Sequence, residues 1–209
     1  MGPIFYQDAI IDYYDFDAVA EMLIANGAKI GLEHVPFGRG THHLDAADPA
    51  CGMMVSRDLP NRENFHWIAK TLEFDFVIAA TESDGPPPAA GELIATYAAK
   101  FPQDQLERSG FRSIVYYSKD QGAAMLRSKR VSHIAIFEPD IEGFSARLHQ
   151  PLKSVMSLGH VVSWLACNPA VSQKDVDMIG QAWRKGVSSG RVRAIYRHKG
   201  IARFWPRSP

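Results

Sequence analysis

The spacing of apolar positions along the chain predicts both helices and strands. Apolar residues recur every three or four positions over residues 15–27 and 176–186, which is typical of amphipathic helices. Asp15 or Asp17 can cap the first of these helices, and Asn26 with Gly27 can end it. A further helix is expected over 40–47 and a closing helix over 188–196. Short alternating or continuous apolar runs predict strands at 4–6, 29–35, 50–55, 72–80 and 160–167.

Between the last two of these strands the pattern switches regularly from one period to the other. It predicts strands at 92–99, 112–117 and 131–137, with helices at 102–109 and 120–130 between them. Such alternation favours βαβ units with parallel strands, so the fold class is α/β. Residues 83–91, rich in proline and glycine, have the composition of a linker.

Two arginines lie just beyond the strand predicted at 50–55. Arg57 follows the strand almost directly. Pro60 suits the first turn of a helix, so Arg62 would lie at the start of that helix. Ligands of open α/β sheets bind at the carboxyl ends of strands, and a guanidinium there can hold a carboxylate through two parallel hydrogen bonds. The alternative is that both arginines are solvated surface charges.

The loop at 56–62 resembles the serine–arginine–threonine–proline–glutamate–arginine loop of type 2 periplasmic solute-binding proteins. The resemblance is to bacterial family 3, the polar-amino-acid-type receptors of ABC transporters, and it covers nearly the whole chain. The aromatic run that follows this loop in the family corresponds to residues 65–70, and residues 36–39 are similar to its proline–tryptophan–x–arginine. Phe37 stands at the tryptophan position and Leu59 where the family has threonine.

The resemblance implies a two-lobed fold in which each lobe is a βα sheet sandwich and the chain crosses twice at hinges. Lobe 1 would comprise residues 1–83 and 160–209, and lobe 2 residues 84–159. It also implies capture of a small polar or anionic solute, an amino acid or an organic acid, in an interlobe cleft. The protein would be a periplasmic monomer that delivers this solute to the membrane permease of an ABC transporter.

The resemblance, together with the chemistry of the side chains, predicts the ligand-binding residues. Arg62, assisted by Arg57 and Arg39, would hold the acid group of the ligand. Ser56 would donate a hydrogen bond to the ligand, and Tyr6 would pack on it. Glu138, at the end of a strand, could meet an amine, and Lys100 could add positive charge. The full predicted set is Tyr6, Arg39, Ser56, Arg57, Arg62, Lys100 and Glu138.

Other functions find less support in the sequence. It contains no nucleophile elbow, phosphate-cradling glycine loop or zinc helix motif, so no catalytic residue and no cofactor are predicted. His34, His42 and His43 lack the spacing of metal ligands. An alternative function on the same fold is a ligand-sensing or partner-docking domain that has lost transport, and an enzyme on this scaffold is a third.

Charge and cysteine usage refine this picture. The chain has 23 basic and 23 acidic residues in 209, so nothing indicates a nucleic-acid partner. The basic C-terminal segment is interpreted as a solvated helix face and tail. Cys51 and Cys167 are expected to be buried free thiols. A disulfide between them is the alternative, because the resemblance places both cysteines in one lobe. No apolar run is long enough to span a membrane, and the sequence shows no signal-peptide pattern. Export is implied by the resemblance alone.

Overall fold

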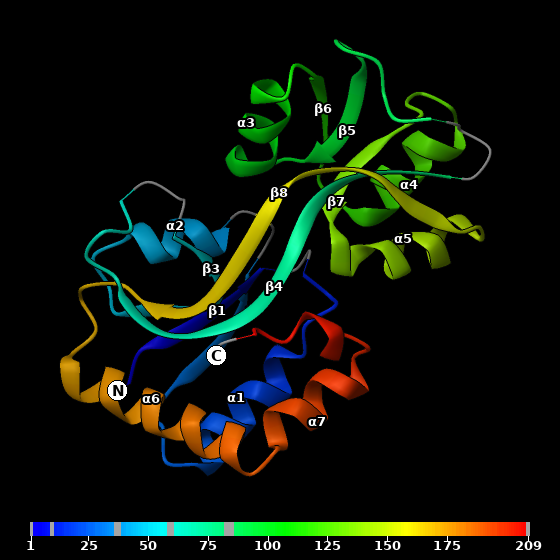
Figure 1. Cartoon of the computed structure of the whole chain (residues 1–209). Helices are drawn as coiled ribbons and strands as arrows, with labels where there is room; N and C mark the ends of the chain where they lie inside the picture. The colour runs from blue at the N-terminus through cyan, green and yellow to red at the C-terminus, as the bar shows by residue number, and fades with distance from the viewer. Residues whose placement is uncertain (1, 9–10, 36–38, 58–60, 82–85, 208–209) are drawn as a thin grey trace. The chain divides into compact units, whose positions relative to one another are not determined.

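The computed structural model describes residues 2–8, 11–35, 39–57, 61–81 and 86–207. It is an α/β structure that divides into two compact units. Unit 1 comprises Met1–Glu73 and Val162–Pro209, and unit 2 comprises Phe74–Val161. The α/β class predicted from the sequence is confirmed (Figure 1).

Unit 1 is built on strands in the order β2-β1-β3-β8-β4. Strand β1 (Ile4–Asp8) pairs in parallel with β2 (Gly31–Val35) and with β3 (Ala50–Ser56), and β8 (Leu152–Cys167) runs antiparallel to β3. The five-residue β1 is therefore enough to serve as the first strand. Helix α2 (Arg39–Asp45) packs on β1 and β3.

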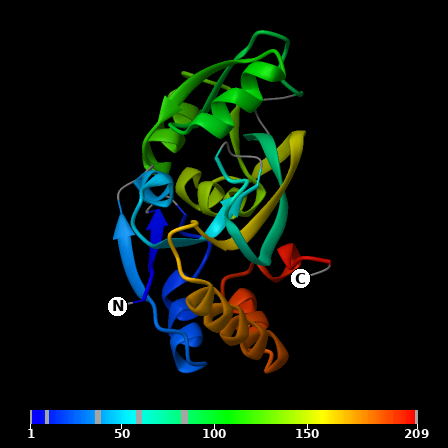
Figure 2. The ribbon, with the colours of Figure 1, turned by 90° about the vertical axis from the view of Figure 1, so that its left-hand side faces the viewer.

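Three further helices of unit 1 pack against one another although they come from opposite ends of the chain. They are α1 (Phe16–Ala25), α6 (Gln173–Ser188) and α7 (Arg191–His198), which Figures 1 and 2 show side by side. A short 3₁₀ turn, η2 (Ala202–Phe204), follows α7.

Helix α1 shows how closely local signals set the bounds of a helix. The side chain of Asp15 accepts a hydrogen bond from the backbone N–H of Ala18 at 3.1 Å, as an N-cap does. Asn26 is the C-cap, and Gly27 follows with a positive φ of 103° that glycine adopts readily. The apolar side of the helix is buried through Phe16, Val19, Ala20, Met22 and Leu23. The helix predicted over 15–27 is confirmed.

Unit 2 contains the strand order β4-β7-β5-β6. Strands β5 (Leu93–Tyr97), β6 (Arg112–Tyr116) and β7 (Ile134–Phe137) pair in parallel, as the alternating pattern predicted. Helices α3 (Lys100–Arg108) and α4 (Lys119–Arg127) connect them. After β7 come a 3₁₀ turn, η1 (Glu138–Asp140), and helix α5 (Ile141–Leu148), neither of which the sequence analysis assigned.

The chain passes between the units within two long strands. Strand β4 (His66–Thr81) and strand β8 are each 16 residues long and lie next to each other in the sheet. The chain first passes from unit 1 to unit 2 at Glu73–Phe74, inside β4. This point comes before the proline-rich segment 83–91, which has the composition of a linker. The second half of β4 pairs antiparallel with β7, which attaches it to unit 2. Residues 82–85 of the linker lie outside the described residues.

The helix predicted to start near Pro60 is absent from the described residues around it. Residues 61–65 form turns without helix, and strand β4 begins at His66. The aromatic and β-branched side chains at 65–68 favour a strand, and too few residues remain before it for a helix to form. Asp58, Leu59 and Pro60 lie outside the described residues.

The expectation of free thiols is wrong, because Cys51 and Cys167 form a disulfide. The two residues stand directly opposite each other on the antiparallel strands β3 and β8, with Cα atoms 4.0 Å apart. The sequence could not reveal this register, because 116 positions separate the two cysteines. The bond ties the C-terminal part of unit 1 to its N-terminal part.

Replacing both cysteines, as Cys51→Ala with Cys167→Ala, should lower the free energy of unfolding by about 2–5 kcal/mol, because the bond closes a long loop in the unfolded chain. Urea unfolding of the oxidised protein, the reduced protein and the double variant measures this. The reduced protein and the variant should agree. A midpoint that does not move on reduction would contradict the structural role of the bond.

Candidate functional site

The carboxyl ends of the parallel strands of unit 1 gather several of the predicted residues. Strand β3 ends at Ser56, Arg57 follows it, and Tyr6 lies on the neighbouring strand β1. Ser56 is half-buried and Arg57 is exposed. This edge is where open α/β sheets hold their ligands. Ser56 and Arg57 thus share this edge, whereas Tyr6 lies in the middle of β1, one residue beyond the pair Phe5–Cys51.

Tyr6 lines a small hollow on this part of unit 1. Its ring stacks on the imidazole of His43 in α2, with centroids 4.1 Å apart and planes 5° from parallel. The hollow has a volume of about 90 Å³ and is otherwise lined by Ile11, Phe16, Gly40, Leu44 and residues 52–55. Burial, followed by the charges of Glu33 and Asp48, raises the pKa of Tyr6. The phenol is therefore held in its protonated form, which can donate a hydrogen bond.

Arg57 lies on an aromatic platform. Its guanidinium carbon is 3.8 Å from the centroid of the Trp164 ring and 4.8 Å from that of Trp67. The two indoles meet edge to face, with centroids 5.9 Å apart. Within the described residues no carboxylate pairs with Arg57. Stacking on indole orients a guanidinium while leaving its N–H groups available to an anion.

Arg62 has a different environment. It is only 3% exposed, and its guanidinium forms an ion pair with Asp45 and lies 4.5 Å from the centroid of the Phe65 ring. Its Nε has no hydrogen-bond partner. Asp45 ends α2, just before the turn that leads into the amino end of β3. Ligand binding by Arg62 stays a prediction, and the charge of its guanidinium is already balanced inside unit 1.

The side chain of Asn168 fixes the turn that precedes β3. Its Oδ1 accepts a hydrogen bond from the backbone N–H of Ala50 at 3.2 Å, and its Nδ2 donates to the carbonyls of Ala46 and Asp48 at 3.1 and 2.8 Å. Asn168 is buried. Asp45, immediately before this turn, is thereby held in place to meet Arg62.

The remaining predicted residue of unit 1 is Arg39. It is the first residue of α2, is exposed, and has no carboxylate partner within the described part of the chain. Phe37 and the rest of 36–38, which carried the proline–tryptophan-like resemblance, lie outside the described residues. Arg39 and Arg57 are therefore two cations of unit 1 that remain available to an anion.

In unit 2 the corresponding edge lies at the ends of β5, β6 and β7. Lys100, the first residue of α3, is exposed there. Glu138 begins η1 directly after β7 and is half-buried, and its Oε2 accepts a hydrogen bond from the backbone N–H of Asp75 at 3.4 Å. Lys100 and Glu138 thus both lie at the carboxyl edge of the parallel strands of unit 2.

A buried polar cluster at the same edge was not predicted. The Tyr97 hydroxyl donates to Oδ2 of Asp140, and the Lys119 ammonium donates to Oδ1 of the same carboxylate. All three residues are buried, at 2%, 2% and 5% exposure in the order named. They follow or end β5, β7 and β6 respectively, so only the strand order brings them together. The position of Lys119 in the first turn of α4, directly after a strand, was the one available signal.

Half-buried aromatic side chains complete the edge of unit 2. Phe137, the last residue of β7, stacks on Phe101 of α3 with centroids 6.2 Å apart and on Tyr97 with centroids 5.9 Å apart. Such rings offer flat apolar surface beside the polar groups of Lys100 and Glu138.

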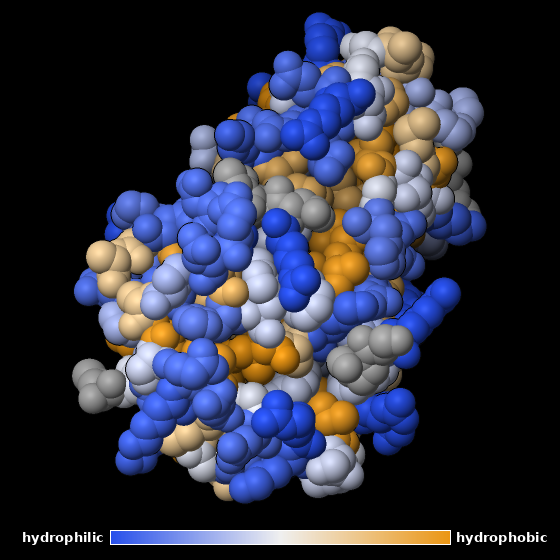
Figure 3. Space-filling model, turned by 60° about the vertical axis from the view of Figure 1, so that its left-hand side comes forward, coloured by the Kyte–Doolittle hydropathy of each residue, from blue (hydrophilic) through white to orange (hydrophobic). Residues whose placement is uncertain are grey.

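The described residues contain neither a metal-ligand cluster nor a helix suited to a membrane span. No three histidine, cysteine or carboxylate side chains gather there as metal ligands would. None of the described helices has both the length and the apolar character of a membrane span. The face in Figure 3 is covered mainly by hydrophilic side chains, with smaller apolar patches between them.

Comparison with known proteins identifies the fold. No family model matches the chain, and no curated protein matches its sequence. Solved structures do match: a putative L-cystine ABC transporter from Listeria monocytogenes has a TM-score of 0.79 at 13% identity and covers 100% of both chains. The GluR0 ligand-binding core from Nostoc punctiforme, in complex with L-glutamate, has a TM-score of 0.78 at 14% identity over 95% of this chain and 99% of its own.

A third similar structure is the amino-acid ABC transporter substrate-binding protein AbpA from Streptococcus pneumoniae bound to L-arginine. It has a TM-score of 0.76 at 11% identity, covering 98% of this chain and 97% of its own. The chain therefore has the two-lobed periplasmic-binding-protein fold of type 2 that the sequence resemblance implied. At these identities the comparison concerns the fold alone.

Replacing Asp45 by alanine should lower the free energy of unfolding by about 3 kcal/mol, the low end for breaking a buried ion pair, because Asp45 is itself partly exposed. Urea unfolding measures the change. Arg39→Ala, an exposed arginine at the other end of the same helix, is the control and should change stability by less than about 0.5 kcal/mol. Equal effects in the two variants would show that the buried pair contributes little.

Proposed function

We propose that this protein is a solute-binding protein that captures a small polar or anionic molecule, an amino acid or an organic acid, without transforming it. The observation that carries the proposal is Arg57, an exposed guanidinium without a carboxylate partner among the described residues, oriented by two indoles at the carboxyl end of β3. The fold, which similar amino-acid-binding structures share, supports the same reading.

In this proposal unit 1 binds the acid group of the solute. Arg57 donates two parallel N–H groups to the carboxylate, and Arg39 adds a second positive charge. Ser56 donates a hydrogen bond from the end of β3, and the protonated phenol of Tyr6 packs on the solute and donates another. Arg62 acts mainly as a positioning residue, since its guanidinium already pairs with Asp45.

Unit 2 contributes the remaining polar contacts. Lys100 attracts an anionic part of the solute, and Glu138 accepts a hydrogen bond from an amine if the solute carries one. Asp140, the other acid of η1, is bound by Lys119 and Tyr97 and is assigned a structural role. The two units are proposed to act as the two lobes of the fold.

We also propose that the protein works outside the cytoplasm, as a monomer, and delivers its solute to a membrane permease of an ABC transporter. The disulfide between Cys51 and Cys167 supports an oxidising compartment, where such bonds persist. No nucleic acid, metal or cofactor has a part in this function.

A ligand-sensing domain is the second candidate function. One of the similar structures is the GluR0 ligand-binding core, which has L-glutamate bound. Arg62 pairs with Asp45 and Asp140 with Lys119, whereas in a site built only for a solute these charges would face the solute. Uptake of the bound solute by cells with and without the gene distinguishes the two: transport requires the gene, whereas a sensor leaves uptake unchanged.

A thermal-shift screen of amino acids and small organic acids tests solute binding. A solute at 100 times its Kd should stabilise the folded state by about 2.7 kcal/mol. Arg57→Ala should weaken binding of the best solute about tenfold or more, because hydrogen bonds to charged groups contribute about 1.5–3 kcal/mol.

Arg108→Ala is the matched control, since Arg108 is an exposed arginine at the end of α3, away from the strand ends. Its affinity for the solute should equal that of the unchanged protein. Identical affinities in the Arg57 and Arg108 variants would rule out the assigned role of Arg57, and the absence of any stabilising solute would count against solute binding itself.

A further inference from the structure

The C-terminal segment of unit 1 concentrates positive charge. No acidic residue follows Ser188, whereas the segment contains Arg191, Arg193, Arg197, Lys199, Arg203 and Arg207. Since acidic and basic residues balance over the whole chain, the rest of the protein carries a corresponding negative excess. Such segregation creates a local positive potential, which the solute site does not use.

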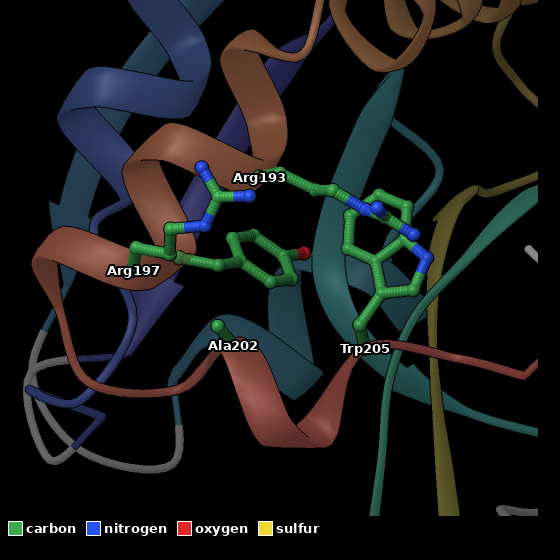
Figure 4. A pocket seen from close by; sticks show the side chains of 5 residues that line it. Arg193, Arg197, Ala202 and Trp205 are labelled. Carbon is green, nitrogen blue, oxygen red and sulfur yellow. The ribbon is translucent and has the colours of Figure 1, made fainter.

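The basic segment encloses a pocket. Arg193, Tyr196 and Arg197 of α7, together with Ala202 of η2 and Trp205, line a cavity of about 170 Å³ (Figure 4). Gly200, with a positive φ of 72°, allows the chain to turn back after α7, and the ring of Trp205 then meets that of Tyr196 edge to face at 5.3 Å. The pocket is therefore formed by a short, locally connected stretch of chain.

The floor of the pocket is rigid. Tyr196 is buried, and its hydroxyl donates to the backbone carbonyl of Thr71 at 3.1 Å and lies 3.0 Å from the hydroxyl of Tyr14. The phenol is thus fixed from behind, by groups on β4 and near the start of α1. At 1% exposure it closes the floor of the pocket and leaves recognition to other side chains.

Two guanidinium groups supply that recognition. Arg193 and Arg197 lie one helical turn apart, both are exposed, and neither has a carboxylate partner in the described part of the chain. The guanidinium carbon of Arg193 lies 5.6 Å from the centroid of the Trp205 ring, which orients it along the wall of the pocket. Like charges at this spacing on a helix repel each other, and binding of an anion beside them relieves the repulsion.

We propose that this pocket is a second binding site, distinct from the solute site, that takes a phosphate group. A phosphate monoester carries a charge near −2, which balances two guanidiniums, and its oxygens match their forked N–H groups. Trp205, which is half-buried, supplies flat apolar surface for the group that carries the phosphate. The phosphate comes either from a soluble ester or from the headgroup of an anionic lipid.

The test measures binding of two probes to the full chain. Phenyl phosphate is titrated while its phosphorus NMR signal is followed, and flotation is measured with vesicles of phosphatidic acid in phosphatidylcholine. The double variant Arg193→Ala with Arg197→Ala should lose about tenfold or more in affinity for at least one probe. Both residues are exposed on a helix, so alanine preserves the fold.

The matched control removes the same charge from the neighbouring helix. Arg184→Ala with Lys185→Ala changes two exposed cations of α6 that do not line the pocket, and it should retain the affinity for both probes. Saturable binding of phenyl phosphate that the Arg193–Arg197 variant loses identifies a soluble ester, and loss of vesicle binding alone identifies a lipid. Equal losses in the two double variants, or no saturable binding of either probe, would overturn the proposal.

Discussion

The antiparallel pairing of β3 with β8 determines the candidate site of unit 1. The disulfide between Cys51 and Cys167 fixes one end of this pairing, the register shifts between Gly52 and Val55, and Ser56 faces Ser163 at the other end. With that register, Arg57 leaves β3 directly beside Trp164, and Trp67 of β4 completes the surface under its guanidinium. A shift of one residue would move these side chains to the opposite face of the sheet. The pairing of two strands that are remote in sequence thus positions the cation assigned to the solute.

Charged side chains in the two units fall into two groups with different physical roles. Arg62 is buried and pairs with the exposed Asp45, and Lys119, Asp140 and Tyr97 form a fully buried cluster. Removing one partner of such a group leaves a charge without compensation, so these clusters define the structure around the strand ends. Arg39, Arg57 and Lys100 are exposed and keep their hydrogen-bonding capacity for a solute. Arg62, the main ligand arginine in the family resemblance, belongs to the first group and is proposed to act as a positioning residue.

The local signals in the sequence predicted much of the fold. The caps of α1 and the regular switching of hydrophobic period in unit 2 depend on residues close together in the chain, and both predictions are confirmed. The helix predicted at Pro60 was wrong. A proline followed by acidic and polar residues is common at helix starts, but the aromatic run that follows here belongs to strand β4. The disulfide and the Lys119–Asp140 pair arise from strand order and register, which no local pattern encodes.

Hydrogen–deuterium exchange with and without the solute that stabilises the protein best would test most directly whether the strand ends of both units bind it. The account predicts slower exchange on binding in the peptides that contain Tyr6, Ser56 with Arg57, Lys100 and Glu138, with helix α7 unchanged. Protection confined to one unit, or protection of α7 with none at these strand ends, would contradict the account.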